Sequence, residues 1–441
     1  MNLPSYIRSC IDRLEKAGFA AYCVGGCVRD SLLGLVPHDY DLCTSASPEQ
    51  IKQVFSDCRL VLAGEKHGTV TVIMAHQPVE ITTFRTEGGY GDSRHPDWVR
   101  FVSSIEEDLS RRDFTVNAMA YSPVRGFADP FGGQADLRSK TLRAVGDPIA
   151  RFTEDALRIL RGVRFSVRYG LCPEPNTQQA MMTLTPLMDK LARERVFDEL
   201  CKLLPHVQAE DLLRFSPVLI QAIPELASCV GFDQHSPHHA FDIFTHTAHV
   251  VAAMPADPAL RLAALLHDIG KPRVFYRDEN GRGHFPGHAA LGAEMADAVL
   301  RRLRAGNELR TRVVSLIQNH MIPLEPDKRL LRRRLSKLGT DGVRDLLILQ
   351  RADFGSKGVG EKTDVFDRVQ TLTEQILQED ACLSLKDLAV SGHDLIALGY
   401  SGKAIGTCLS YLLEQVLDEH LANEKATLLA AAREFLQEVS P

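Results

Sequence analysis

The first stretch whose residue types could carry chemistry runs from Gly25 to Asp41. Gly25 and Gly26 predict a turn that opens a short helix over residues 28–33. Asp39 and Asp41 are one residue apart, so on a strand their side chains would point the same way. Two carboxylates on one face, beside a glycine turn that can approach phosphate, indicate a site for Mg²⁺ and a nucleoside triphosphate. A glycine turn before a helix and two surface aspartates explain the same residues.

A third carboxylate follows in a predicted hairpin of residues 69–74 and 79–84. Strand alternation puts Val79, Ile81 and Thr83 on one face, and Glu80 on the other. Two interpretations of Glu80 stay open, a further metal ligand or a solvated residue on an edge strand.

An arginine-rich helix is predicted over residues 151–169. One face is apolar, and another carries charged residues at spacings of three or four, namely Asp155, Arg158, Arg161, Arg164 and Arg168. Four stacked arginines repel one another unless something anionic lies beside them. An arginine can donate to the acceptors of cytosine and an aspartate can accept an amino proton, so Asp155 and Arg158 could read a base. The alternative is a solvated charged face.

A second constellation, in the C-terminal half, consists of histidines and aspartates. Its candidate metal ligands are His246, His267, Asp268, His288, His320 and Asp353, with His284 nearby in the sequence. Neutral imidazoles and carboxylates that converge from successive helices form a site for one or two transition metals. One histidine in a helix is usually only packed or solvated, but His267-Asp268 followed by Ile-Gly-Lys is harder to obtain by chance.

The whole chain must position these two groups. At 441 residues it should hold two to four domains, and 44% hydrophobic with 24% charged residues is typical of a globular protein. The net charge of −6 argues against wholesale coating of nucleic acid but allows a local basic groove, for which the run at 328–351 is a candidate. Ten scattered cysteines without a CxxC pair, and the lack of a signal peptide or long apolar run, predict a reducing cytoplasm.

The periodicity predicts an α+β protein, mixed up to about residue 150 and helical afterwards. Helices are expected over 3–17, after Ser47-Pro48, and over 104–120, where the last carries Arg112, Asp113 and Asn117. A glycine-rich loop of the kind that is usually functional or disordered is expected over 87–100.

These motifs together resemble the class II tRNA nucleotidyltransferases, the bacterial CCA-adding enzymes of the nucleotidyltransferase and poly(A) polymerase superfamily. The resemblance rests on Gly25-Gly26-x-Val28-Arg29-Asp30 with Asp39-x-Asp41, Arg112–Asn117, Glu154-Asp155-x-x-Arg158 with Arg161 and Arg164, and Arg193–Leu200. The histidine set resembles an HD phosphohydrolase domain, and the segment 90–99 resembles the flexible loop of enzymes that add the complete CCA.

The resemblance implies a head with a small mixed sheet (1–148), an all-α neck (149–205), an HD-type body (206–355) and a helical, tRNA-binding tail (356–441). It implies that Asp39 and Asp41, with Glu80 as the open case, hold catalytic Mg²⁺, and that the second site takes Mn, Ni, Co or Fe. It further implies a nucleotide-binding set of Gly25, Gly26, Arg29, Arg112, Asp113, Asn117, Glu154, Asp155, Arg158, Arg161 and Arg164. The implied reaction is template-independent addition of C, C and A to the 3′ end of tRNA from CTP and ATP, with no membrane and no obligate protein partner.

Other interpretations remain. A bacterial poly(A) polymerase shares the head motifs but usually has a basic C-terminal extension, whereas this chain ends in an acidic-amphipathic helix. A partial enzyme, adding only A or only CC, is a second alternative, which the loop at 90–99 disfavours. An HD phosphohydrolase with a regulatory nucleotide-binding module would not need Asp39, Asp41 and the Asp155–Arg158 pair, and a non-enzymatic RNA-binding module would need neither carboxylate set.

Overall fold

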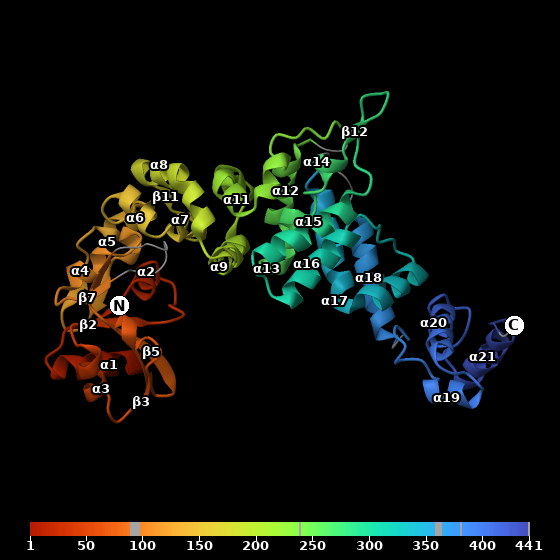
Figure 1. Cartoon of the computed structure of the whole chain (residues 1–441), viewed down its shortest axis with the longest axis horizontal. Coiled ribbons are helices and arrows are strands. Elements are labelled where there is room, and N and C mark those ends of the chain that lie inside the picture. Colours follow the sequence, from red (N-terminus) through yellow and green to blue (C-terminus); the bar gives the residue numbers. More distant parts are fainter. Residues whose placement is uncertain (89–97, 238–239, 358–363, 380–381, 440–441) are drawn as a thin grey trace. The chain divides into compact units, whose positions relative to one another are not determined.

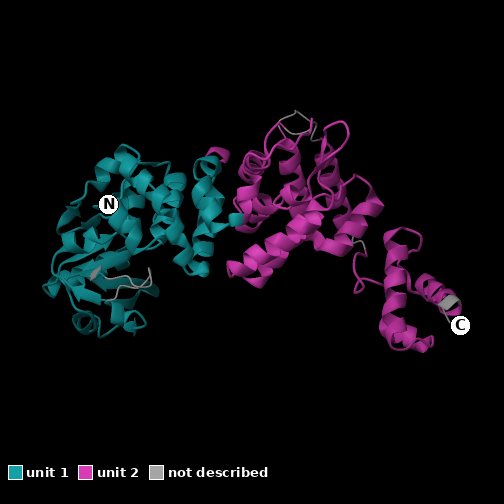
Figure 2. Cartoon of the chain, turned by 45° about the horizontal axis from the view of Figure 1, so that its top comes forward, with its two compact units in different colours: residues 1–207, 211–224 teal, residues 208–210, 225–441 magenta. Residues whose placement is uncertain are grey.

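The computed structural model describes residues 1–88, 98–237, 240–357, 364–379 and 382–439 (Figure 1). The chain forms two compact units, residues 1–207 with 211–224 and residues 208–210 with 225–441 (Figure 2). Residues 89–97 of the loop predicted over 87–100, with most of the segment 90–99, lie outside the described residues. The two ends of this predicted loop are wrong, because residues 87–88 and 98–100 lie in paired strands. The finer division into head, neck, body and tail stays a prediction.

A seven-stranded mixed sheet forms the centre of the N-terminal part, as predicted. Its strand order is β3-β4-β5-β2-β1-β8-β9, and only β2 and β5 run parallel. The strands are β1 (Ala21–Val24), β2 (Asp41–Thr44), β3 (Arg59–Val61), β4 (Thr69–Met74), β5 (Gln77–Thr83), β8 (Ala120–Ser122) and β9 (Gly126–Ala128). A separate hairpin joins β6 (Arg85–Gly88) to β7 (Trp98–Phe101).

Helices pack against the apolar side chains on both faces of this sheet. One face packs against α1 (Ser5–Lys16) and α3 (Pro48–Val54), the latter begun by a capping box between Ser47 and Gln50. On the other face Tyr22, Val24, Cys43 and Phe84 form a core with Ile105 and Leu109 of α4 (Ile105–Ser110). The carboxylates of the predicted metal site lie at the end of this buried layer.

The predicted hairpin of β4 and β5 is confirmed. Its connecting residues Ala75 and His76 both have positive φ, 48° and 63°, which matches a two-residue turn that follows the strand twist. Because β5 is flanked by β4 and β2, Glu80 does not lie on an edge strand, although its side chain is exposed.

Two local predictions in the head are wrong. The strand begins at Asp41, so Asp39 precedes it. The helix predicted over 104–120 ends at Ser110, because the segment around Asp113 instead pairs its backbone with the chain near residue 144. Thr115 donates its backbone N–H to the Arg143 carbonyl, and Val145 donates to that of Asp113.

The arginine-rich helix is also interrupted. Helix α6 (Pro148–Glu154) ends before Asp155, whose backbone is extended at φ −143° and ψ 101°, and α7 (Leu157–Tyr169) begins after it. The break turns the Asp155 side chain off the α7 face on which it was predicted. Other helices of this unit include α2 (Gly26–Leu32), α5 (Gly133–Arg138), α8 (Pro175–Leu184), α9 (Arg193–Leu203) and α11 (Ser216–Ala222). Strand β10 (Thr141–Leu142) pairs with β11 (Cys172–Pro173).

The described residues of the rest of the chain form helices and loops, apart from a hairpin of two short strands, β12 (Tyr276–Arg277) with β13 (Gly283–His284). Its helices are α12 (Ile243–Ala253), α13 (Pro258–Leu266), α14 (Lys271–Val274), α15 (His288–Arg302), α16 (Asn307–Asn319), α17 (Lys328–Gly355), α18 (Asp364–Gln378), α19 (Gly392–Ala397), α20 (Lys403–Leu417) and α21 (Lys425–Val439). The short α10 (Ala209–Arg214) precedes them. Among the described helices, none combines the length and apolar character needed to cross a membrane.

The basic run on α17 is engaged within the chain. Arg332 pairs with Glu419, Arg333 with Asp418, and Lys328 with Glu379. These partly exposed ion pairs, with acidic residues that directly follow α18 and α20, agree with a charged solvent face. Contact of this run with RNA stays a prediction.

Candidate nucleotide and metal sites

A pocket of about 460 Å³ brings together the predicted residues of the N-terminal unit. Both predicted catalytic aspartates line it, and so does every predicted nucleotide-binding residue except Glu154, namely Gly25, Gly26, Arg29, Arg112, Asp113, Asn117, Asp155, Arg158, Arg161 and Arg164. Glu80 does not line it. The lining also includes Arg111, Leu157, Phe165 and Arg195, which the candidate site set did not contain.

The carboxylates of the metal site interact with one another. The register that pairs Leu42 with Ile81 places Asp41 beside Glu80 on the parallel strand. Burial, together with the charges of Asp39 and Glu80, raises the pKa of Asp41 to about 6 despite the opposing charge of Arg112. A divalent cation relieves this kind of repulsion, so the three carboxylates fit the donor set of a Mg²⁺ site.

The glycine turn approaches the pocket because it lacks side chains. Gly25 has φ 75°, which favours glycine, and a Cβ built on it would lie 2.8 Å from Nη1 of Arg112. Gly26 then opens α2, whose first N–H groups are available to an anion.

Arg29 is buried and held by three partners. Its Nη1 donates to Oδ1 of Asn117 at 2.5 Å, its Nη2 donates to the Tyr169 hydroxyl at 2.5 Å, and its Nε donates to Asp30 at 2.8 Å. The guanidinium also lies over the Tyr169 ring, 4.2 Å from its centroid. The Arg29 side chain is therefore held by Asp30 and Asn117 and by Tyr169 at the end of α7.

Asp113 connects the two halves of the pocket. One oxygen accepts from Asn117 at 3.0 Å, and the other accepts from Nε and Nη2 of Arg161 at 2.9 and 2.7 Å. Burial alone would raise the pKa of Asp113, but the Arg161 charge and these hydrogen bonds outweigh it and lower the pKa to about 2. The carboxylate is thus ionised at any working pH, and it orients Arg161.

The predicted base-reading pair is held by separate partners. Arg158 donates to Glu154 at 2.7 Å and to the backbone carbonyls of Arg151 and Arg111 at 3.1 and 3.0 Å. Asp155 accepts from the Leu157 N–H at 3.0 Å and from Nη2 of Arg195 at 2.8 Å. Each oxygen of Asp155 keeps a second lone pair for a ligand donor.

Three of the four arginines of α7 have carboxylate partners inside the protein, whereas Arg168 is exposed. Arg164 donates its Nε to Glu199 at 2.7 Å, as Arg158 does to Glu154 and Arg161 to Asp113. Stacked arginines repel one another unless anionic groups lie beside them. Carboxylates of the protein itself provide these anionic groups for Arg158, Arg161 and Arg164. Glu199 and Arg195 both lie on α9, in the motif Arg193–Leu200 that was noted without a role for each residue.

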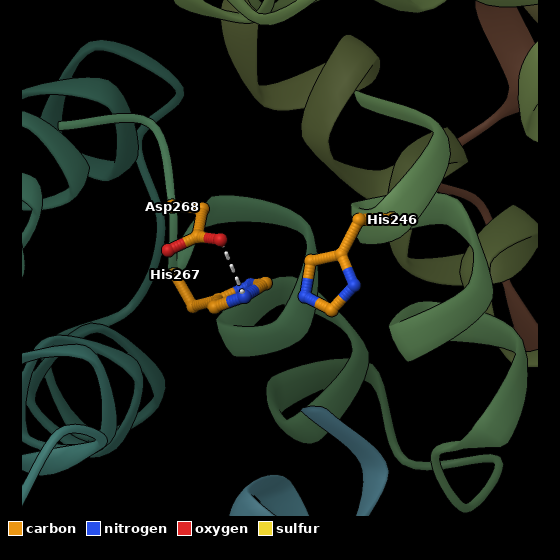
Figure 3. A group of neighbouring side chains, drawn as sticks. All are labelled: His246, His267 and Asp268. Carbon is orange, nitrogen blue, oxygen red and sulfur yellow. Dashed lines mark ion pairs between the residues drawn. The ribbon is translucent and has the colours of Figure 1, made fainter. Parts of the chain in front are cut away.

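The histidine cluster of the C-terminal unit assembles as predicted. His246 comes from α12, His267 and Asp268 follow α13, His288 begins α15, and His320 follows α16. Ligand atoms of His246, His267 and Asp268 lie within 4.8 Å of one another (Figure 3). The ligand atoms of Asp268, His288 and His320 do so as well. Asp353, on α17, completes the set by accepting from His246, with 2.8 Å between Nε2 and Oδ1.

Hydrogen bonds at Nδ1 orient the imidazole rings of three of these histidines. Nδ1 of His267, His288 and His320 lies 2.7, 2.8 and 2.6 Å from the carbonyls of Ala264, Phe285 and Ile317, respectively. Donation from Nδ1 leaves a lone pair on Nε2, which is the atom that faces Asp268. These three Nε2 atoms are buried without a hydrogen-bond partner in the described part of the chain. Orphaned lone pairs beside buried carboxylates fit a bound cation.

Two of these three histidines are neutral, because burial lowers the pKa of His288 and lowers that of His320 to about 4. Burial would also lower the pKa of His267, but the charge of Asp268 and its hydrogen bond raise it, so a metal at this nitrogen would displace a proton. Burial would raise the pKa of Asp268, but the charges of His267 and Lys271 hold it well below its ordinary range. His284 pairs with Asp278 on the neighbouring hairpin, and it lines a cavity of about 240 Å³ together with Asp268, His288, His320 and Asp353.

Comparison with known proteins defines first a class. The profile of the poly A polymerase head domain matches residues 21–143, that of a probable RNA and SrmB-binding site of polymerase A matches 170–229, and that of the HD domain matches 243–354. Fold and sites therefore define a nucleotidyltransferase of the poly(A) polymerase type joined to an HD domain. Domains of both kinds use divalent metals.

Full-length similarity then defines the family. A CCA-adding enzyme of Limosilactobacillus fermentum is 34% identical over 431 residues, which cover 98% of this chain and 96% of that protein. A CCA-adding enzyme of Streptococcus suis is 51% identical over 206 residues, about half of each chain, 46% of this one and 51% of the relative. The chain belongs to the family of CCA-adding enzymes.

Solved structures of CCA-adding enzymes resemble the fold of this chain. The Bacillus stearothermophilus CCA-adding enzyme in complex with CTP has a TM-score of 0.74 and 28% identity, with 99% of both chains covered. The Thermotoga maritima CCA-adding enzyme complexed with tRNA shares the fold, with a TM-score of 0.57 and 20% identity over 98% of this chain and 96% of that one.

Proposed function

We propose that this protein adds C, C and A in sequence to the 3′ end of tRNA, from CTP and ATP and without a nucleic-acid template. One observation carries the proposal: a single pocket holds the carboxylates Asp39 and Asp41, the glycine turn and the Asp155–Arg158 pair. Metal, triphosphate and base can therefore be bound in one place. The CTP of the Bacillus enzyme and the tRNA of the Thermotoga enzyme support this choice of substrates.

We assign the metal site to Asp39 and Asp41, with Glu80 as a third ligand because of its register beside Asp41. Mg²⁺ bound there would lower the pKa of the tRNA 3′ hydroxyl and would stabilise the negative charge on the leaving pyrophosphate. Gly26, Arg29 and Arg112 hold the triphosphate in line with the attacking hydroxyl. Asn117 and Tyr169 keep Arg29 in place for this task.

We assign base selection to Asp155 and Arg158. Cytosine and adenine both present an exocyclic amino group, which a carboxylate accepts, whereas uracil does not. Arg158 donates to a ring acceptor, and its bonds to Glu154 and to two backbone carbonyls fix the direction of its fork. Basic residues elsewhere bind tRNA by its phosphates and shape.

One assay tests this proposal against its neighbours. Wild-type protein with Mg²⁺ is given tRNAs that end before CCA, after one C and after CC, each with CTP, ATP or both, all labelled. With CTP alone we expect C on the first two ends, with ATP alone we expect A only on the third, and with both nucleotides we expect complete CCA on all three. Poly(A) tails without use of CTP would indicate a poly(A) polymerase, and failure at one kind of end would indicate a partial enzyme.

The buried histidine cluster favours a second activity. We propose that it binds Mn, Ni, Co or Fe and hydrolyses phosphoesters, with the neutral histidines and Asp268 as ligands. Release of phosphate from a chromogenic phosphomonoester or phosphodiester, dependent on one of these metals, tests it. Metal-free protein that stays inactive with all four metals contradicts it.

A cytoplasmic location also remains a proposal, and it agrees with the ten cysteines, all described and all free thiols.

A further inference from the structure

The ring of Phe165 is surrounded by arginines. The guanidinium carbons of Arg164, Arg29 and Arg161 lie 4.3, 5.2 and 5.3 Å from the ring centroid. Phe165 is 3% exposed, yet it lines the pocket. Cations within about 6 Å of a ring face are attracted to its quadrupole, so one phenyl ring can hold several guanidinium groups close together.

A second ring extends this arrangement. Tyr169 lies one helical turn after Phe165 on α7, and the two rings stack at 6.1 Å with an interplanar angle of 28°. Arg29 lies over the Tyr169 ring and donates to its hydroxyl at 2.5 Å. Thus Arg29, which comes from the glycine-turn helix, is held by aromatic residues of the helix that carries Arg158, Arg161 and Arg164.

The carboxylates of the pocket do not explain this geometry by themselves. Asp113 and Glu199 satisfy Arg161 and Arg164 from one side, while Arg29 takes its only carboxylate contact, among the described residues, from Asp30. The rings fill the space between three like charges with a surface that attracts each of them. Phe165 is in turn fixed edge-on against Phe114, at 5.8 Å and 83°, so it cannot rotate freely.

We propose that Phe165 and Tyr169 are positioning residues for nucleotide binding. They hold Arg29, Arg161 and Arg164 in a fixed arrangement, and they couple the arginine of the triphosphate side to the helix that reads the base. This inference rests on the proposed nucleotide addition and adds two residues to its machinery. It predicts that CTP and ATP, which share a triphosphate, lose affinity together when the rings are altered.

The test uses full-length protein and four variants. Phe165→Leu removes the π face but keeps an apolar side chain, and Phe165→Tyr keeps the face. Tyr169→Phe keeps the ring but removes the hydroxyl that accepts from Arg29. Phe152→Leu is the matched control, because Phe152 is fully buried and packs on Phe114 at 6.2 Å, but no arginine lies over its ring in the described structure.

We measure kcat and KM for CTP, ATP and tRNA, and the Kd for CTP by equilibrium dialysis. Phe165→Leu should raise KM for both nucleotides and the Kd for CTP about tenfold, with KM for tRNA unchanged. Tyr169→Phe should raise the same constants about threefold, and Phe165→Tyr should stay near wild type. Phe152→Leu should lower thermal stability without changing KM.

Two outcomes overturn the inference: a Phe165→Leu protein whose KM and Kd equal those of Phe152→Leu, or a Phe165→Tyr protein as impaired as Phe165→Leu. If wild-type protein extends no tRNA end, the proposed function fails instead. The Kd comparison between Phe165→Leu and Phe152→Leu then still decides whether the rings position the arginines.

Discussion

The nucleotide pocket and the histidine cluster both gather ionisable side chains, but they balance charge in opposite ways. In the pocket, Arg158, Arg161 and Arg164 each have a carboxylate partner within 2.7 Å. In the cluster, the Nε2 atoms of His288 and His320 are buried without a hydrogen-bond partner among the described residues. The three arginines of the pocket are paired while the pocket is empty, whereas these imidazoles have no partner until a cation binds.

The difference in charge pairing affects how stable each site is without its ligand. An open pocket with internally paired arginines stays folded when empty, and an entering triphosphate shares cations that are already oriented. A buried cluster with orphaned lone pairs carries an unfavourable desolvation cost until a metal binds, so metal binding should also stabilise the fold.

The largest expected effect comes from removing a carboxylate of the pocket. Asp41→Ala or Asp39→Ala should lower nucleotide addition at least about a thousandfold, because the metal that stabilises the developing charge is lost. Binding of tRNA, measured by gel shift, should survive. Glu49→Ala, an exposed carboxylate at the start of α3, serves as control. Turnover retained by either aspartate variant contradicts the metal assignment.

The opposite behaviour is expected of the cluster. Mn²⁺ at about a thousandfold excess over its Kd should stabilise the protein by about 4 kcal/mol and raise its thermal midpoint in calorimetry. His267→Ala should abolish this rise, whereas His393→Ala, at an exposed histidine on α19, should keep it. Equal responses of both variants would show that the metal binds elsewhere.

Arg158→Ala should change nucleotide choice more than folding. Loss of one base contact costs about 1–3 kcal/mol of discrimination, so the preference for CTP over UTP should fall about tenfold or more. Single-turnover addition with each of the four nucleotides measures this. Arg138→Ala, an exposed arginine on α5, should leave the choice unchanged. Unaltered selectivity in Arg158→Ala refutes its role with the base.

The smallest effect concerns Asp113, whose pKa of about 2 lies below its ordinary value of 3.8. Its stabilising contribution, about 2 kcal/mol, is present above pH 4 and is lost as the pH falls towards 2. In urea denaturation, Asp113→Asn should therefore lose stability at neutral pH and show a weaker acid dependence. Asp57→Asn, at an exposed pair with Arg13, should do much less. An unchanged acid dependence in Asp113→Asn contradicts the assignment.

Local patterns predicted the parts of the pocket that lie close together in the chain. The glycine turn needs only the backbone freedom of Gly25, and the strands alternate as their residue types require. The sequence also predicted which histidines and aspartates gather in the cluster, because their residue types mark them as candidate metal ligands. Neither prediction needed knowledge of packing.

The errors arise where distant segments compete with local periodicity. The helix predicted over 104–120 fails because the chain near Asp113 pairs its backbone with the chain near residue 144. The helix over 151–169 breaks at Asp155, whose carboxylate is held by Arg195, forty positions later. Periodicity reports the faces of an element, and it carries no information about a partner far along the chain. The internal carboxylate partners of the arginines were missed for the same reason.

The ion pairs of α17 change what its positive charges mean for RNA. Lys328, Arg332 and Arg333 are already neutralised by Glu379, Glu419 and Asp418. An RNA phosphate that took one of these cations would displace a carboxylate of the protein, and fewer counterions would be released than the count of basic residues suggests. The salt dependence of tRNA binding should therefore be shallower than this run of lysines and arginines implies.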